Sequence, residues 1–180
     1  MTTPPPTPLI SVVVAVRNAE STLRRTLQSL ELQTTRDFEI ILIDGASTDG
    51  TLRVAEDFRE DIAFQLSEQD SGIADAWNKG VQNARGTWII FLNAGDLLHR
   101  DHFTRALSLL KDCTDRPTVL YGDVLKFNFL NEPTVSIRGR PPTERGIKLG
   151  GIGFAHPGCL ASASCFAKIG QFDTSLRIAI

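Results

Sequence analysis

The sequence predicts an α/β fold built on a doubly wound, mostly parallel sheet. Apolar runs rich in valine and isoleucine alternate with segments of helical periodicity, and such runs are typical of strands buried on both faces of a parallel sheet. The alternation continues through five strands up to residue 123 and favours right-handed crossovers. Of the 180 residues, 42% are hydrophobic and 22% are charged, which is ordinary for a globular domain.

The first two strands are predicted over residues 9–16 and 38–43. The helix between them has its apolar residues at the spacing of one helical face, and Asn18 is a candidate cap for it; these residues are Leu23, Leu27 and Leu30. A polar turn at 45–51 follows the second strand and leads into a second helix, with Ser47, Thr48 or Asp49 as its cap.

The next elements repeat this pattern. A weaker third strand is predicted over 62–66, a helix over 72–84 and a fourth buried strand over 87–92. A further helix follows with Asp101 as its candidate cap, and a fifth strand covers 118–121. This order gives the sheet its parallel part.

The pattern changes after residue 123. Residues 124–129 and 134–138 are predicted to pair as a hairpin. Residues 139–153, rich in glycine, proline and basic residues, are predicted to form a long irregular loop, and such loops are often functional. A strand over 156–162 and a short helix over 164–169 complete the predicted elements.

Composition excludes several classes of function. The formal net charge of −2 gives no general attraction to nucleic acid. Three cysteines are too few for a disulfide framework, so we expect buried thiols in a reducing cytoplasm. Residues 1–8 are proline-rich, resemble no signal peptide, and are expected to be disordered. No apolar run is long enough to cross a bilayer, although contact with a membrane surface stays open.

Polar clusters follow the first four strands. They are Arg17 with Asn18, Asp44, residues 68–72 and residues 93–96. In an open parallel sheet, ligands bind beyond the carboxyl ends of the strands, where these clusters should converge. The sequence therefore predicts one binding site along this edge.

Each candidate residue also has a structural interpretation. Asp44 could bind a base or ribose, or cap the following turn; Asp96 could hold Mg²⁺ or Mn²⁺ together with phosphate oxygens, or cap a helix. Trp77 and Trp88 are interpreted as packing residues. His156 could be structural or could close over a ligand beside the flexible loop.

Two basic residues, Lys79 and Arg85, are interpreted as solvated helix charges more readily than as phosphate ligands. The glycine fingerprint of dinucleotide-binding proteins is absent after the first strand, as are the P-loop motif and the nucleophile elbow of hydrolases.

Taken together, the ordered motifs closely resemble family 2 inverting glycosyltransferases of the GT-A fold, especially those of bacterial surface-polysaccharide synthesis. The motifs are LISVVVAVRNAESTLRRTLQSLELQT, FEIILIDGASTDGT, SEQDSGIADAWNKGVQNARGTWIIFLNAGD and YGDV, and the resemblance covers about residues 9–180. It implies a single glycosyltransferase domain over 9–180, with a Rossmann-like nucleotide-sugar-binding part at 9–123 and an incomplete acceptor-side part at 124–180.

The resemblance also implies roles for individual residues. Ala15, Arg17, Asn18, Asp44, Asp70, Asn93 and Asp96 would bind the nucleotide-sugar, with Asp44 toward the base or ribose. Asp96 would be the metal ligand for Mg²⁺ or Mn²⁺, although Asn93 and Gly95 stand where the family often has acids, as Gly45 does after Asp44. His156 would lie on the acceptor side.

The implied reaction is hexosyl-type transfer from a nucleoside-diphosphate-sugar to an acceptor hydroxyl, with inversion and a carboxylate general base. The acceptor would be a saccharide or a lipid-linked saccharide, in polysaccharide or glycolipid synthesis. The enzyme would be cytoplasmic, with possible peripheral association at the inner face of the membrane. No nucleic-acid partner is expected.

The catalytic base is not assigned to any residue of this chain. The family's acidic motif is expected just beyond Ile180, and Asp173 comes too early to replace it. The chain is therefore expected to be truncated at its C-terminus. The alternative function is a catalytically inactive remnant that binds nucleotide-sugar without transferring the sugar.

Overall fold

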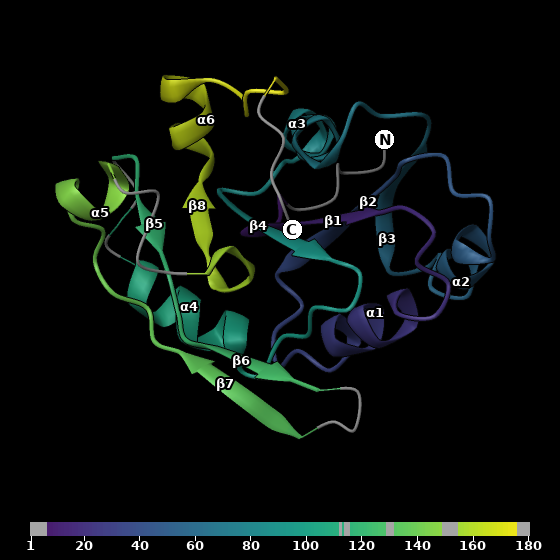
Figure 1. The fold of residues 1–180 in the computed structure, drawn as a ribbon, viewed down its shortest axis with the longest axis horizontal. Helices are drawn as coiled ribbons and strands as arrows, with labels where there is room; N and C mark the ends of the chain where they lie inside the picture. Colours follow the sequence, from purple (N-terminus) through teal and green to yellow (C-terminus); the bar gives the residue numbers. More distant parts are fainter. Residues whose placement is uncertain (1–6, 112, 114–115, 129–131, 149–154, 176–180) are drawn as a thin grey trace, which may run out of the picture.

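The computed structural model describes residues 7–111, 113, 116–128, 132–148 and 155–175. Its centre is a six-stranded sheet in the order β3-β2-β1-β4-β8-β5 (Figure 1). The strands are β1 (Ile10–Val16), β2 (Phe38–Asp44), β3 (Ile62–Ser67), β4 (Trp88–Asn93), β5 (Val119–Leu120) and β8 (Leu160–Ser162). The first four pair in parallel, which confirms the predicted fold class.

The register of the parallel strands fixes the position of the candidate site. Val16 of β1 is paired with Asp44 of β2, and Ala15 is paired with Asn93 of β4. The three strands therefore end side by side, and their following loops leave the sheet at the same edge. The predicted clusters after these strands are brought together for this reason.

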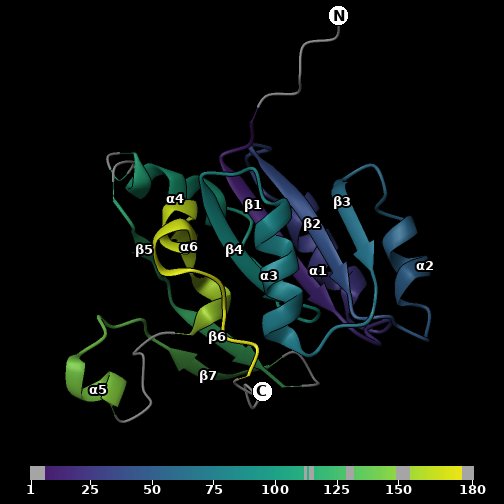
Figure 2. The same ribbon diagram turned by 90° about the horizontal axis from the view of Figure 1, so that it is seen from above.

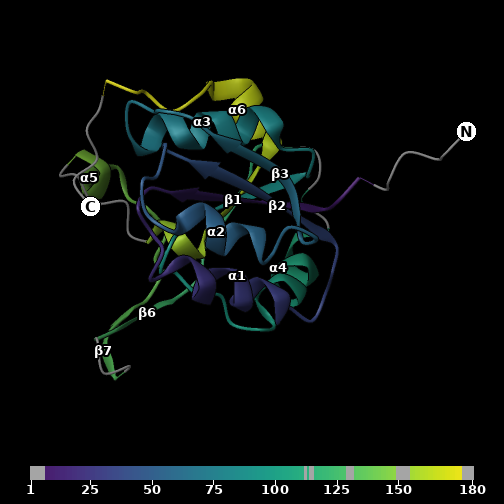
Figure 3. The ribbon, with the colours of Figure 1, turned by 90° about the vertical axis from the view of Figure 1, so that its right-hand side faces the viewer.

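Helices cover both faces of the sheet, as Figures 2 and 3 show. On one face lie α1 (Leu23–Glu31), α2 (Thr51–Glu56) and α4 (His102–Leu110). On the other face lie α3 (Ile73–Asn83) and α6 (Ala163–Ile169). Alternate residues of the strands enter the two apolar cores, because successive side chains of a strand point to opposite faces.

The predicted strand over 156–162 is wrong in its first half. A short 3-10 helix, η1 (His156–Gly158), comes first, and β8 begins only at Leu160. β8 lies antiparallel between β4 and β5. The two strands that are consecutive in the sequence are therefore not neighbours in the sheet, which the order of the elements along the chain does not predict. This insertion brings η1 to the end of β4.

The hairpin is confirmed with different bounds, as a separate two-stranded sheet of β6 (Val124–Phe127) and β7 (Pro133–Ile137). It extends from the body of the domain (Figure 1). The prediction of an irregular loop over 139–153 is wrong for the helix α5 (Glu144–Lys148), in which Lys148 Nζ lies 2.7 Å from Glu144 Oε1. The rest of that loop from residue 149, and residues 1–6 of the lead-in, lie outside the described residues.

Three predicted caps differ from the structure. Thr22, not Asn18, occupies the cap position of α1. Gly50, and none of Ser47, Thr48 or Asp49, occupies the cap position of α2. Asp101 does precede α4, but its side chain makes no cap hydrogen bond.

The three cysteines are free thiols and only partly buried, and burial raises the pKa of Cys159 to about 11. Within the described ranges, no helix is long and apolar enough to cross a membrane.

Candidate functional site

The loops after β1 and β2 are joined by Asn18. Its backbone has φ of +49°, the left-handed region that asparagine tolerates better than most residues. In this conformation its N–H donates to Ser47 Oγ at 2.8 Å, and its Oδ1 accepts the Thr48 N–H at 2.9 Å. Asn18 thus fixes the loop after β1 to the loop after β2 at the edge of the candidate site.

Asp44 is fully buried at the end of β2. Its carboxylate accepts hydrogen bonds from the Ser47 N–H at 3.0 Å and from Ser67 Oγ at 2.6 Å, and a further short one from Ser47 Oγ. The structure therefore shows the turn-supporting role that the sequence left open, since this carboxylate fixes the turns after β2 and β3. A contact of Asp44 with a nucleotide stays a prediction.

Arg17 and Asp70 meet over Gly45. A Cβ at Gly45 would lie 3.2 Å from Asp70 Cγ, closer still to Oδ2, and 3.5 Å from Arg17 Cδ. Asp70 Oδ1 also accepts the Gly72 N–H at 3.0 Å. Because Gly45 has no side chain, the Asp70 carboxylate and the Arg17 side chain, which come from two different loops, can both lie close to it.

The turn after β4 is closed by Asp96. Its Oδ2 accepts the Asn93 N–H at 3.1 Å, and its own N–H donates to the Asn93 carbonyl at 3.0 Å. Gly95 has φ of +107° and donates its N–H to Thr26 Oγ1 at 2.8 Å. This geometry positions a half-buried carboxylate at the sheet edge. Across the described part of the chain, no three His, Cys, Asp or Glu side chains gather as a metal site.

His156 lies against Trp77, with ring centroids 5.1 Å apart. Burial lowers the pKa of His156, and the negative charge of Asp96 partly opposes this effect. The structure therefore brings His156 into the electrostatic range of Asp96, across 60 residues of sequence. Its Nε2 is buried and has no hydrogen-bond partner among the residues that the structure describes.

Lys79 and Arg85 are engaged in structural contacts. Lys79 Nζ lies 2.9 Å from Glu68 Oε1 and 3.1 Å from the Gln69 carbonyl oxygen, and the hydrogen bond with Glu68 raises its pKa. Arg85 Nη2 lies 2.7 Å from Oε2 of the buried Glu39. Both basic residues stabilise loops, which disfavours the phosphate interpretation. Trp77 and Trp88 are buried, as expected for packing residues.

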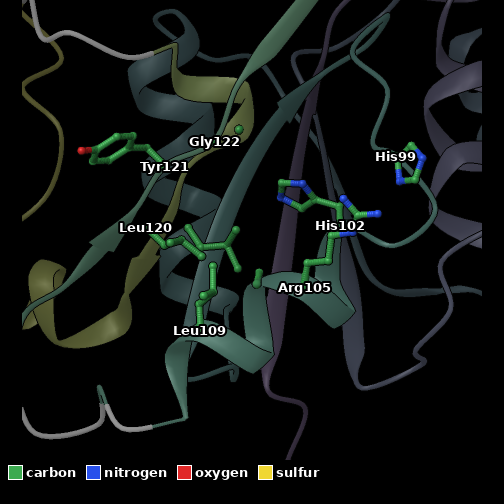
Figure 4. A pocket seen from close by; sticks show the side chains of 10 residues that line it. His99, His102, Arg105, Leu109, Leu120, Tyr121 and Gly122 are labelled. Carbon is green, nitrogen blue, oxygen red and sulfur yellow. The ribbon is translucent and has the colours of Figure 1, made fainter. Parts of the chain in front are cut away.

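A cavity of about 200 Å³ lies between α4, β5 and the start of β8 (Figure 4). Burial lowers the pKa of His102, which lines this cavity, and the nearby His99 adds to the effect. The cavity was not predicted, because its walls come from segments that are far apart in the sequence and meet only in the fold. It is lined by His99, His102, Arg105, Ala106, Leu109, Leu120, Tyr121, Gly122, Gly158 and Leu160.

Comparison with known proteins identifies relatives for this arrangement. The family model described as glycosyl transferase family 2 matches residues 11–163. A PGL/p-HBAD biosynthesis glycosyltransferase of Mycobacterium tuberculosis is 36% identical over 122 residues, which cover 66% of this chain and 47% of that protein. The putative glycosyltransferase EpsH of Bacillus subtilis is 35% identical over 111 residues, covering 61% of this chain and 32% of EpsH.

Among solved structures, S. aureus TarS in complex with UDP superposes with a TM-score of 0.73 at 21% identity, covering 93% of this chain and 51% of the TarS chain. The mannosyltransferase PcManGT from Pyrobaculum calidifontis, in complex with GDP-Man and Mn²⁺, gives a TM-score of 0.66 at 22% identity and covers 94% of this chain and 48% of its own. These two likenesses show the fold. The chain spans about half the length of the M. tuberculosis relative. Because the family model covers most of the sequence, the chain belongs to glycosyl transferase family 2.

Proposed function

We propose that the protein transfers a hexose-type sugar from a nucleoside-diphosphate-sugar to an acceptor hydroxyl, with inversion, in polysaccharide or glycolipid synthesis. The observation that carries the proposal is the common end of the parallel strands β1, β2, β3 and β4, which gathers Arg17, Asp70 and Asp96 at one edge of a family 2 domain. The names of the relatives, and the UDP, UDP-GlcNAc and GDP-Man complexes of the structural neighbours, support it.

The nucleotide would bind along the loops after β1, β2 and β3. Arg17 and Asp70 over Gly45 offer a cation for the diphosphate and a carboxylate that accepts hydrogen bonds from ribose hydroxyls or a base imide. Ala15 and Asn18 would line the same pocket. Asp44 would act mainly by holding the serines that shape it.

Asp96 would hold a Mg²⁺ or Mn²⁺ ion together with the diphosphate. One carboxylate with phosphate oxygens is a common way to bind such ions, and the Asn93 N–H already orients the Asp96 carboxylate. When bound, the ion compensates the negative charge that develops on the leaving group. Residues 9–123 would then form the donor part of the domain, and residues from 124 onward the acceptor side.

Asp173 is a poor general base. Hydrogen bonds from the side chain and the backbone N–H of Ser175, at 2.6 and 2.9 Å, lower its pKa. This favours a base elsewhere in the full-length enzyme. It is also the observation that favours the second candidate function, binding of nucleotide-sugar without transfer.

The acceptor would be a saccharide or a lipid-linked saccharide. A lipid-linked acceptor would place the enzyme in the cytoplasm at the inner face of the membrane. Both are proposals, and the name of the M. tuberculosis relative, a PGL/p-HBAD biosynthesis glycosyltransferase, supports only a biosynthetic glycosyl transfer. Transfer to soluble and lipid-linked saccharides, assayed side by side, would separate the two acceptor classes.

Calorimetric titration of the full-length protein with UDP, GDP and dTDP, with and without Mn²⁺, tests the donor site. We expect one nucleotide to bind more tightly with Mn²⁺, and Asp96→Asn to remove that gain. Asp61→Asn, at an exposed position before β3, is the matched control and should keep it. Failure of all nucleotides to bind the folded wild type would refute the proposal, and binding without sugar transfer would favour the second function.

A further inference from the structure

Within the described part of the chain, three buried polar atoms without hydrogen-bond partners belong to residues around the end of β4. They are Trp77 Nε1, Asn93 Oδ1 and His156 Nε2. Phe91 and Asn93 are two positions apart on β4 and face the same side of the sheet, the side covered by α3. Trp77 of α3 lies with its ring centroid 5.2 Å from Phe91 and 5.1 Å from His156.

Such a group needs an explanation, because a buried polar atom without a partner costs about 1–3 kcal/mol and few occur in native proteins. In the parts of the chain that the structure describes, only one further side chain, His102 on the α4 side, has such an atom. The three atoms therefore form a local concentration of unsatisfied hydrogen-bonding capacity.

The chemistry of the three atoms selects among ligands. The indole N–H of Trp77 can only donate, the carbonyl oxygen of Asn93 can only accept, and the Nε2 of a neutral His156 does one or the other according to its tautomer. A diphosphate needs donors and would be repelled by the Asn93 oxygen. A sugar hydroxyl donates and accepts, and the apolar faces of a sugar ring pack against aromatic rings such as Trp77.

We propose that Trp77, Asn93 and His156 bind the sugar of the nucleoside-diphosphate-sugar donor. This inference rests on the proposed function and names a specificity-determining site for it. The position fits, because the backbone N–H of Asn93 donates to Asp96 Oδ2 at 3.1 Å and the charge of Asp96 acts on His156. The sugar would thus lie directly beyond the diphosphate held at Asp96. In this proposal His156 contacts the donor sugar, whereas the resemblance implied a place on the acceptor side.

Entry of the sugar requires a small rearrangement, because the three atoms are closed off from water in this structure. Phe172 also packs against Trp77, with ring centroids 5.2 Å apart, and its backbone is fixed by Asn78. His156 is only half-buried and lies at the start of η1. Rotation of its side chain is therefore the motion that would expose Trp77 Nε1.

The test compares binding of a sugar nucleotide with binding of the nucleotide alone. Full-length protein is titrated with UDP-GlcNAc against UDP and with GDP-Man against GDP, and the pair that binds the wild type is used. Trp77→Phe keeps an aromatic ring and removes the N–H; His156→Phe keeps the ring contact and removes Nε2. Trp88→Phe is the matched control, since Trp88 belongs to the apolar core on the opposite face of β4.

We expect Trp77→Phe and His156→Phe each to weaken sugar-nucleotide binding about 5- to 10-fold, as the loss of one hydrogen bond predicts. Binding of the nucleotide alone should stay unchanged, and Trp88→Phe should change neither. Equal effects on both ligands, no effect, or a raised acceptor KM with unchanged donor binding would overturn the proposal. If neither nucleotide binds the wild type, the proposed function itself fails, which is a distinct result.

Discussion

The side chain of Asn78 holds the backbone of Phe172 through two hydrogen bonds, although 94 residues separate them. Asn78 Nδ2 donates to the Phe172 carbonyl at 2.9 Å, and the Phe172 N–H donates to Asn78 Oδ1 at 2.8 Å. Asn78 is buried on α3, and Phe172 packs on Trp77 and Phe91. This pair therefore attaches the segment after α6 to α3.

Replacing Asn78 by alanine should release this segment. Both hydrogen bonds are lost and the Phe172 backbone groups are left unpaired, so we expect the free energy of unfolding to fall by about 1–3 kcal/mol. Hydrogen exchange should show faster exchange at residues 172–175 than in β1. Asn83→Ala, which removes only a bond to the Lys79 carbonyl within the same helix, is the control and should leave that segment protected.

The buried Glu39 should make stability depend on pH. Burial alone would raise its pKa, but hydrogen bonds from Ser11 and from the backbone and guanidinium of Arg85 lower it overall. The ionised form is thus favoured by folding, so its stabilisation is full above the ordinary value of 4.5 and is lost as pH falls through the lowered folded-state pKa.

Glu39→Gln tests this dependence. We expect a loss of about 1–3 kcal/mol at pH 7, because the Arg85 charge and the buried Ser11 hydroxyl lose their ionised partner. Urea unfolding of the wild type and the variant, measured from pH 7 down to pH 3, should show the difference shrinking below pH 4.5. A difference that stays constant with pH would contradict the assignment.

Gly80 allows α3 to lie close to β1. A Cβ at this position would lie 2.9 Å from Val13 Cγ2 and closer still to Cγ1. Gly-to-Ala changes in helices usually stabilise by up to about 1 kcal/mol, but here overpacking should dominate and destabilise Gly80→Ala by about 1–3 kcal/mol. Chemical denaturation measures the change. The double variant with Val13→Ala should recover part of the loss, and strict additivity would show that the contact is not the cause.

Gly45→Ala should weaken nucleotide binding with little effect on stability. Its Cβ would displace the Asp70 carboxylate from the space beside Arg17. Asp70 is half-buried in a loop and its side chain can shift, so the unfolding free energy should change by less than about 0.5 kcal/mol. Calorimetry should show a several-fold rise in Kd for the nucleotide. In an Asp70→Ala background, Gly45→Ala should have no further effect on the Kd of the nucleotide. A full additional rise in Kd would show that Gly45→Ala does not act by displacing Asp70.

The sequence by itself determined the elements that build the parallel part of the sheet. Two kinds of signal are local in the sequence: the apolar runs of β1, β2 and β4, and the apolar face of α1. They are local because the side chains that an element buries recur with the spacing of its own backbone. The convergence of the polar loops also followed from the sequence, since parallel neighbouring strands end at a common edge.

Only the tertiary structure decided which polar groups meet. The pairs Glu39–Arg85 and Asn78–Phe172, and the placement of His156 beside Trp77, join distant parts of the chain. The insertion of β8 between β4 and β5 brings η1 to the candidate site. β8 has only three residues, too few for the sequence to predict with which strands it pairs. Periodicity reports the burial of each segment, whereas contacts between segments depend on how whole elements pack, and that information is not local.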